Sequence, residues 1–274
     1  MSSSANPLGI APADWAIVDE LISPAAPKER QGMTVNEGFR IVCLGETGSG
    51  KTTLMRAIVY GTIAKGYSNF ALIHDTKSFA FPEYPKSIMS PNVPTFQARG
   101  FQPSDIPVVS FRGDPRGDVE CTAEEVARYS KWLAQKGRVD PATGRWTTNP
   151  HELVIEELAA AATGGRKHVK SPSVLWALEQ GRKVGVSVLG TTQSVRKVPL
   201  DILEQSSAIV FFRLTGSSVN YLRGNMRLDD QMINTIAGPS GEGLPNYSFC
   251  LYMKSVPWDG KTHRLDPRTA RMFE

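Results

Sequence analysis

From residue 39 onward, short apolar runs alternate with longer amphipathic segments, which is typical of strands that alternate with helices. The expected strands lie in 39–44, 70–75, 106–111, 153–155, 184–192 and 208–214, and the expected helices in 51–66, 122–137, 171–183 and 199–206. The second of these helices opens with Thr122 and, three residues later, Glu125, which is a capping box. This alternation predicts an α/β fold with a mostly parallel sheet covered by helices on both faces.

The two ends of the chain lack this alternation. We expect three parts: an N-terminal arm (1–35), a core (36–215) and a C-terminal appendage packed on the core (216–274). The arm is rich in Pro, Ala and Ser, with one short helix expected at 12–22. A hairpin strand is expected at 247–255, and the proline-crowded stretch 79–107 is expected to form an irregular loop.

Composition narrows the class of protein. The chain has 274 residues, of which 41% are hydrophobic and 21% charged, as in ordinary folded domains. No apolar run approaches the roughly 20 residues of a membrane-spanning helix, and the N-terminus does not look like a secretory signal. Cys43, Cys121 and Cys250 are too few and too scattered to indicate disulfides or a zinc cluster. We therefore expect a cytoplasmic protein, and its net charge of +4 is compatible with an anionic partner.

The strongest chemical signal is GETGSGKT, residues 45–52, which fits the phosphate-loop pattern G-x-x-x-x-G-K-[ST]. Its glycines let backbone N–H groups turn inward around phosphates, and the helix that follows adds its positive N-terminal end. Lys51 is expected to reach the β and γ phosphates, and the Thr52 hydroxyl to ligate Mg²⁺. We expect ATP to be held by Gly45, Glu46, Thr47, Gly48, Ser49, Gly50, Lys51, Thr52 and Thr53.

Two adjacent acids, Glu156 and Glu157, follow the apolar stretch 153–155. Taken alone, they fit the solvated face of a helix. A phosphate-loop ATPase, however, needs one acid that holds Mg²⁺ through water and a second group that orients the attacking water. Because successive side chains of a strand point to opposite faces, one acid can face the metal and the next the γ-phosphate. We interpret the pair as a Walker B element.

Several stretches together resemble the translocases of the FtsK, HerA and VirD4 type, ring-forming ATPases that move DNA. IEELA (155–159) resembles the VDELA element of that family, and HDTK (74–77) resembles the DPK that follows its second strand. GRKVGVSVLGTTQS (181–194) resembles its ARxxGIxLxxATQ stretch. The resemblance covers residues 38–215 and implies a RecA-like core.

The same resemblance implies a role for each matching residue. It assigns Glu157 as the carboxylate that polarises water and Glu156 as the acid beside Mg²⁺. Arg182 corresponds to the arginine finger offered to a neighbouring subunit, and Gln193 to the sensor of the γ-phosphate. The family usually has Asp where this chain has Glu156, so an alignment that makes Glu156 the catalytic acid stays open. Arg182 would also satisfy a helix dipole, and Gln193 would also cap a strand end.

Basic residues near these motifs are candidates for DNA contact. They are Arg166, Lys167, His168 and Lys170, in TGGRKHVK after the acid pair, and Arg196 and Lys197, just after Gln193. In a ring, such a loop would face the central channel and follow DNA phosphates without reading sequence. A solvated basic loop is the alternative interpretation.

The chain has no room for the membrane segments, extra domains or N-terminal barrel of most of that family. It resembles instead the genome-packaging ATPases of membrane-containing icosahedral viruses. The implied partners are double-stranded DNA, further copies of the chain in a ring of six or five subunits, and capsid or portal-vertex proteins. The implied location is the host cytoplasm or the virion vertex. A DNA-transfer or extrusion ATPase is the alternative, and a small-molecule P-loop kinase would need an arginine-rich lid that the sequence lacks.

Overall fold

The fold is described from a computed structural model of the chain. The described residues are 6, 8–30, 33–75, 86–87, 108–112, 122–139, 146–161, 169, 171–214, 216–226, 228–238, 241–254 and 256–273.

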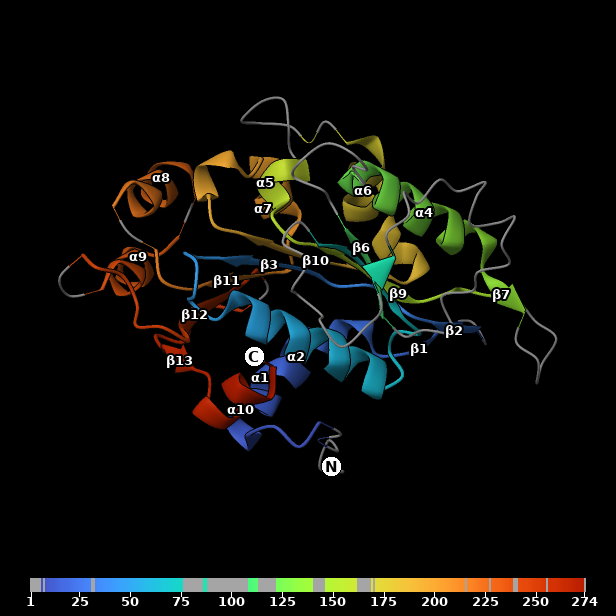
Figure 1. The fold of residues 1–274 in the computed structure, drawn as a ribbon, viewed down its shortest axis with the longest axis horizontal. Coiled ribbons are helices and arrows are strands. Elements are labelled where there is room, and N and C mark those ends of the chain that lie inside the picture. Colours follow the sequence, from blue (N-terminus) through green and yellow to red (C-terminus); the bar gives the residue numbers. More distant parts are fainter. Residues whose placement is uncertain are drawn as a thin grey trace.

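A nine-stranded sheet forms the centre of the molecule (Figure 1), in the order β13-β12-β11-β3-β10-β9-β4-β6-β5. Its strands are β3 (Arg40–Leu44), β4 (Ala71–Asp75), β5 (Lys86–Ser87), β6 (Val108–Arg112), β9 (His151–Ile155), β10 (Val186–Thr192), β11 (Ala208–Phe211), β12 (Ser248–Met253) and β13 (His263–Arg264). The strands from β3 to β11 pair in parallel, while β12 and β13 add an antiparallel edge. The predicted α/β fold with a mostly parallel sheet is confirmed.

Helices cover both faces of this sheet (Figure 1). One layer holds α1 (Pro12–Ile22), α2 (Lys51–Ala64) and α10 (Pro267–Phe273), and the other holds α4 (Ala123–Lys136), α5 (Leu158–Ala161), α6 (Pro172–Glu179), α7 (Leu200–Gln205), α8 (Ser217–Asn225) and α9 (Asp230–Ala237). The strand side chains alternate between the layers. In β3, Ile41 and Cys43 pack with α1 and α2, whereas Val42 and Leu44 pack on the opposite face.

The predicted strands and helices of the core all have counterparts, and so do the helix at 12–22 and the strand at 247–255. The capping box of α4 is confirmed as well: the Glu125 N–H donates to the Thr122 hydroxyl, and the Thr122 N–H donates to the Glu125 carboxylate. The helix expected at 171–183 ends at Glu179 instead, and a 3-10 turn follows at Gly181–Val184, because glycine disfavours continuation of the helix.

Several small elements were not predicted. They are the hairpin of β1 (Lys28–Arg30) and β2 (Met33–Val35), the hairpin of β7 (Arg138–Val139) and β8 (Trp146–Thr147), strands β5 and β13, and helices α5, α8, α9 and α10. The loop expected at 79–107 lies outside the described residues except for β5.

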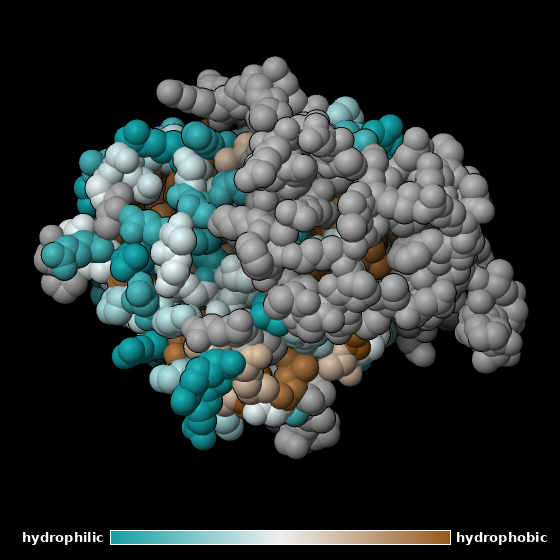
Figure 2. Space-filling model, in the orientation of Figure 1, coloured by the Kyte–Doolittle hydropathy of each residue, from teal (hydrophilic) through white to brown (hydrophobic). Residues whose placement is uncertain are grey.

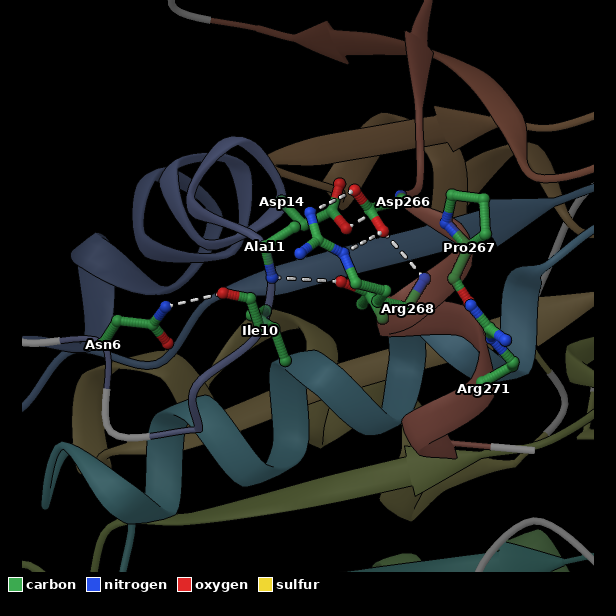
Figure 3. A network of polar contacts seen from close by, with 9 residues as sticks. Asn6, Ile10, Ala11, Asp14, Asp266, Pro267, Arg268 and Arg271 are labelled. Atoms are coloured by element: carbon green, nitrogen blue, oxygen red, sulfur yellow. Dashed lines mark hydrogen bonds and ion pairs between the residues drawn. The ribbon is translucent and has the colours of Figure 1, made fainter.

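Segments from the two ends of the chain meet beside α2. The Ala11 N–H donates to the Thr269 hydroxyl (3.2 Å), and the Asp266 N–H donates to the Asp14 carboxylate (3.0 Å; Figure 3). Asp14 is 1% exposed in spite of its charge. Helix α1 is therefore hydrogen-bonded to the segment that leads into α10 and to α10 itself. Helices α1 and α10 both pack on α2.

The surface over α8 and α9 is mostly hydrophilic (Figure 2). Among the described residues, Val256 and Met272 are the large hydrophobic side chains that are exposed. No helix in the described part of the chain is long and apolar enough to cross a membrane.

Strand β9 contains a buried acid that the sequence patterns did not single out. Glu152 is 0% exposed, on the same face of the strand as Val154, which packs in the α2 layer. Burial raises the pKa of the Glu152 carboxyl well above its usual range. The Thr62 hydroxyl lies near this carboxyl and opposes the rise in its pKa. The same hydroxyl donates a hydrogen bond to the Ile58 carbonyl. Because the folded chain keeps this proton after the unfolded chain has lost it, folding stability falls as pH rises from about 4.

Glu152→Gln should therefore stabilise the chain at neutral pH, because the amide has no proton to lose. We expect its free energy of unfolding to exceed that of the wild type by on the order of 1–3 kcal/mol at pH 8, and by less at pH 5. Urea denaturation at the two pH values measures both differences. Glu242→Gln, at an exposed loop position, is the matched control and should change neither. Equal stabilities of wild type and Glu152→Gln at both pH values would contradict this prediction.

Candidate active site

A cavity of about 250 Å³ opens where the parallel strands β3, β9 and β10 end. It is lined by Thr47, Gly48, Ser49, Gly50, Lys51, Thr52, Thr53, Glu156, Glu157, Thr191, Gln193 and Tyr247. The carboxyl ends of the strands are where open α/β sheets bind their ligands. The fold thus brings the phosphate loop, both acids and the predicted sensor glutamine to one place.

The phosphate loop presents positive groups to this cavity. Helix α2 begins at Lys51, where no described side chain caps it, and the N-terminal end of a helix is a favourable place for an anion. Lys51 is 7% exposed, and its ammonium donates to the Glu46 carbonyl (2.7 Å), inside the curve of the loop. Gly50 has φ +106, and a Cβ there would lie 2.9 Å from Tyr247 Cδ1, so this tight turn requires glycine. The arrangement fits the phosphates of a nucleotide.

Among the residues expected to hold the nucleotide, Gly45 and Glu46 are not part of the cavity wall. The Gly45 N–H donates to the Thr192 carbonyl (3.2 Å), and the Glu46 N–H donates to the Arg213 carbonyl (2.9 Å). The Glu46 carboxylate also forms an ion pair with the Arg213 guanidinium (3.3 Å). These bonds attach the start of the loop to the chain at the ends of β10 and β11. The N–H groups of Gly45 and Glu46 are therefore already in use within the protein.

The two adjacent acids, Glu156 and Glu157, both line the cavity, directly after the end of β9. Glu156 is 4% exposed and follows the alternation that puts Val154 on the α2 side. Glu157 has φ +62, in the left-handed region that non-glycine residues rarely adopt, and there the chain leaves the strand. Leu158 packs directly on β10, because Gly190 has no side chain; a Cβ there would lie 2.2 Å from Leu158. The two acids therefore differ in backbone conformation, since the turn out of the strand falls at Glu157.

A chain of hydrogen bonds connects Gln193 with both the phosphate loop and Glu157. The Thr47 hydroxyl donates to the Gln193 side-chain carbonyl (2.8 Å). The Gln193 N–H donates to one Glu157 carboxylate oxygen (3.4 Å), and the Thr192 hydroxyl donates to the other (2.5 Å). The end of β10 therefore contacts both parts of the site that face the nucleotide phosphates.

Arg182 lies far from the cavity of its own chain. It belongs to the 3-10 turn before β10, and the seven residues of that strand place it about 20 Å from the phosphate-loop edge. Its exposed guanidinium forms an ion pair with Glu37 (2.9 Å). Any contact of Arg182 with nucleotide must therefore involve the site of a second copy.

The fold was compared with known proteins. No known protein family and no curated protein matches the sequence. Among solved structures, the genome packaging NTPase B204 from Sulfolobus turreted icosahedral virus 2, in complex with sulfate, is 18% identical, with a TM-score of 0.57 over 84% of this chain and 98% of that chain. Its complex with ATP-gammaS is 17% identical, with a TM-score of 0.56 over 85% of this chain and 98% of that chain.

B204, the DNA-packaging ATPase from Sulfolobus turreted icosahedral virus, is 17% identical, with a TM-score of 0.56 over 84% of this chain and 97% of that chain. The chain has the B204 fold. At this level of identity, the likeness to B204 concerns the fold and leaves the roles of individual residues to be argued from the site itself.

Two residues of the cavity wall were not predicted from the sequence. Thr191 (4% exposed) is a polar residue near the end of an apolar strand, directly before Thr192 and Gln193. Its place beside the predicted Gln193 could have indicated that it belongs to the site. Tyr247 comes from the segment before β12, with φ +63, and its N–H donates to the Ser49 carbonyl (2.9 Å). No local pattern indicates this contact, because it joins segments far apart in the sequence.

The residues around the cavity also fit a magnesium ion. Mg²⁺ prefers oxygen ligands, and at nucleotide sites it takes one or two protein groups together with phosphate oxygens and water. Thr52 supplies a hydroxyl and Glu156 a carboxylate, and both line the cavity. The predicted metal ligands are therefore brought together.

Arg196 and Lys197 are both exposed, in the 3-10 turn Val195–Lys197 directly after Gln193. Arg196 Nε donates to the Ser217 carbonyl (3.3 Å). The other predicted DNA contacts, Arg166, Lys167, His168 and Lys170, lie outside the described residues, and so does Lys77 of the HDTK stretch.

Proposed function

We propose that this chain is an ATPase that moves double-stranded DNA, and that it packages a viral genome. The observation that carries the proposal is the cavity, in which a complete phosphate loop, two acids and a glutamine meet in a chain with the fold of a genome packaging NTPase. B204 structures have been solved in complex with ATP-gammaS and with AMPPCP, which supports ATP as the substrate.

In this proposal, the phosphate loop binds the triphosphate of ATP. The N–H groups at the start of α2 and the Lys51 ammonium surround the β and γ phosphates. Thr52 and Glu156 would hold Mg²⁺, which would neutralise part of the phosphate charge. Tyr247 closes the wall of the cavity beside Gly50.

Hydrolysis depends on groups at the ends of β9 and β10. Glu157 accepts a proton from the attacking water, and Arg182 of a neighbouring copy stabilises the charge of the transition state. Gln193 responds to loss of the γ-phosphate, because its side chain bonds to Thr47 of the phosphate loop and its N–H to Glu157. The exposed Arg196 and Lys197 lie in the 3-10 turn that follows Gln193. A movement of Gln193 would therefore also move these two basic side chains.

The assembly is proposed to be a ring of six or five copies around DNA. The distance between Arg182 and the cavity of its own chain supports a ring, because each site then needs an arginine from a neighbour. The capsid or portal vertex is the proposed docking partner, in the host cytoplasm or at the virion.

Double-stranded DNA should stimulate ATP turnover by the assembled wild-type protein, and the stimulation should weaken as salt rises, because binding to DNA phosphates releases counterions. Turnover is measured with and without DNA over a series of salt concentrations. The triple variant Arg166→Ala, Lys167→Ala and Lys170→Ala should lose most of the stimulation. Removal of each cation that binds a phosphate should reduce the salt slope of DNA binding by about 1.

The matched control removes three exposed cations elsewhere, with Lys254→Ala, Lys261→Ala and Arg264→Ala. It changes the net charge equally and should keep the stimulation. A rate that DNA does not change, or an equal loss in both triple variants, would contradict the proposed DNA path. The first of these results would leave an extrusion-type ATPase as the better description.

A further inference from the structure

Thr192, the last residue of β10, contacts two different parts of the site at once. It is 1% exposed. Its carbonyl accepts the N–H of Gly45, the first residue of the phosphate loop (3.2 Å). Its hydroxyl donates to the Glu157 carboxylate (2.5 Å). One buried residue thus joins the phosphate loop to the proposed water-activating acid.

The direction of the hydroxyl bond follows from its partners. The Ser194 N–H donates to the Thr192 hydroxyl oxygen (3.1 Å) and occupies one of its lone pairs. A hydroxyl has a single proton, and an ionised carboxylate can only accept. The Thr192 proton therefore points to Glu157, and this charge-assisted bond is stronger than a neutral one.

Sheet register brings the two residues together. Gly190 of β10 pairs with Ile155 of β9, so two positions further along, Thr192 comes opposite Glu157. Leu158, packed on Gly190, fixes the main chain where it leaves β9. The side chain of Glu157 still has several free torsions, and ordering such a side chain costs up to about 2 kcal/mol. The two bonds from β10, one to each carboxylate oxygen, provide that order.

We infer that Thr192 is the positioning residue of Glu157, setting the place of its carboxylate relative to the phosphate loop. The inference rests on the proposed role of Glu157 in hydrolysis and adds a residue to which no role has been given. Thr192 acts through Glu157 and not on the nucleotide, since it does not line the cavity. Its contribution should therefore appear in the rate of hydrolysis and not in nucleotide affinity.

Thr192→Val tests this, because valine keeps the β-branched shape and removes the hydroxyl. We expect kcat for ATP to fall by about 10- to 100-fold, the usual effect of a small misplacement of a catalytic group, with KM little changed. Thr192→Ser keeps the hydroxyl and should stay close to the wild-type kcat. In the Glu157→Gln background, Thr192→Val should lower kcat no further, because the two residues act as a unit.

Three results would overturn the inference. The first is a wild-type or higher kcat for Thr192→Val, and a higher value would mean that the hydroxyl restrains the acid. The second is a Thr192→Ser variant as slow as Thr192→Val. The loss of kcat would then come from altered packing and not from the missing hydroxyl, whether or not the valine variant is less stable. The third is a further loss on top of Glu157→Gln. Failure of the proposed function looks different: Glu157→Gln would then hydrolyse ATP like the wild type.

Discussion

Replacing Glu157 with Gln should reduce ATP turnover by about 10²- to 10⁴-fold while nucleotide still binds. An amide cannot take the proton of the attacking water, and general-base catalysis is worth about that much. Glutamine has nearly the same shape, and its carbonyl can accept the Thr192 hydroxyl proton, so the local fold should persist. The expected phosphate contacts come from other residues of the cavity wall, Thr47 to Thr53, which the substitution leaves unchanged. Steady-state turnover and titration with a fluorescent ATP analogue measure the two properties separately.

Glu156→Gln is the matched control, since it removes one negative charge from the adjacent position. We expect it to raise the Mg²⁺ concentration needed for half-maximal turnover, because Glu156 lines the cavity together with Thr52 and the loss of its charge weakens the binding of Mg²⁺. The result that would reverse the assignment is a loss of turnover in Glu156→Gln at saturating Mg²⁺ with normal turnover in Glu157→Gln. The alternative alignment, with Glu156 as the catalytic acid, would then be correct.

Arg182→Ala should lower ATP turnover by the assembled protein by about 10³- to 10⁵-fold, the usual contribution of an arginine supplied to a phosphoryl-transfer site. Loss of folding stability does not explain such a drop, because Arg182 is exposed and its ion pair with Glu37 is worth at most about 1 kcal/mol. Lys183→Ala, in the same turn and also exposed, removes an equal charge and should keep most of the turnover.

Mixing two inactive variants tests whether Arg182 acts on a neighbour. Lys51→Ala lacks the phosphate-binding ammonium but keeps Arg182, and Arg182→Ala keeps an intact cavity. When the two are mixed before assembly, some interfaces combine a good cavity with a good arginine, and turnover should recover in part. A wild-type rate for Arg182→Ala alone would remove the arginine from the mechanism, and no recovery in assembled mixtures would speak against its action between copies.

The core of this fold was predictable because its signals are local. The strands β3, β4, β6, β9, β10 and β11 are apolar runs that can be read within a short window, and the phosphate loop is a contiguous pattern. Strands of two or three residues, such as β7 and β8, are too short to show any period. Helices α8 and α9 lie beyond the regular alternation of strand and helix, which was the signal that revealed the other helices.

The composition of the site was predictable only in part, for a different reason. Some site residues belong to sequence patterns that occur at a known place in this type of fold. These residues are Glu156, Glu157, Lys51 and Gln193. The bond between Thr192 and Glu157 depends on how β9 and β10 align across 35 positions of sequence, and Tyr247 depends on a contact nearly 200 positions long. For Gly45 and Glu46, the pattern shows that they form the loop, but not that their N–H groups bond to the ends of the neighbouring strands.

The meeting of the chain's two end segments has a consequence for how the molecule folds during synthesis. The contacts from Ala11 to Thr269 and from Asp14 to Asp266 close loops of 258 and 252 residues, and such long-range contacts form late. Tyr247 belongs to the same late segment, since its carbonyl accepts the N–H of Leu265 (2.9 Å). The ribosome makes the phosphate loop early, but the wall that completes its cavity arrives only when the last part of this sequence emerges. A nascent chain is therefore unable to form the finished nucleotide site before residues 247–265 have been made.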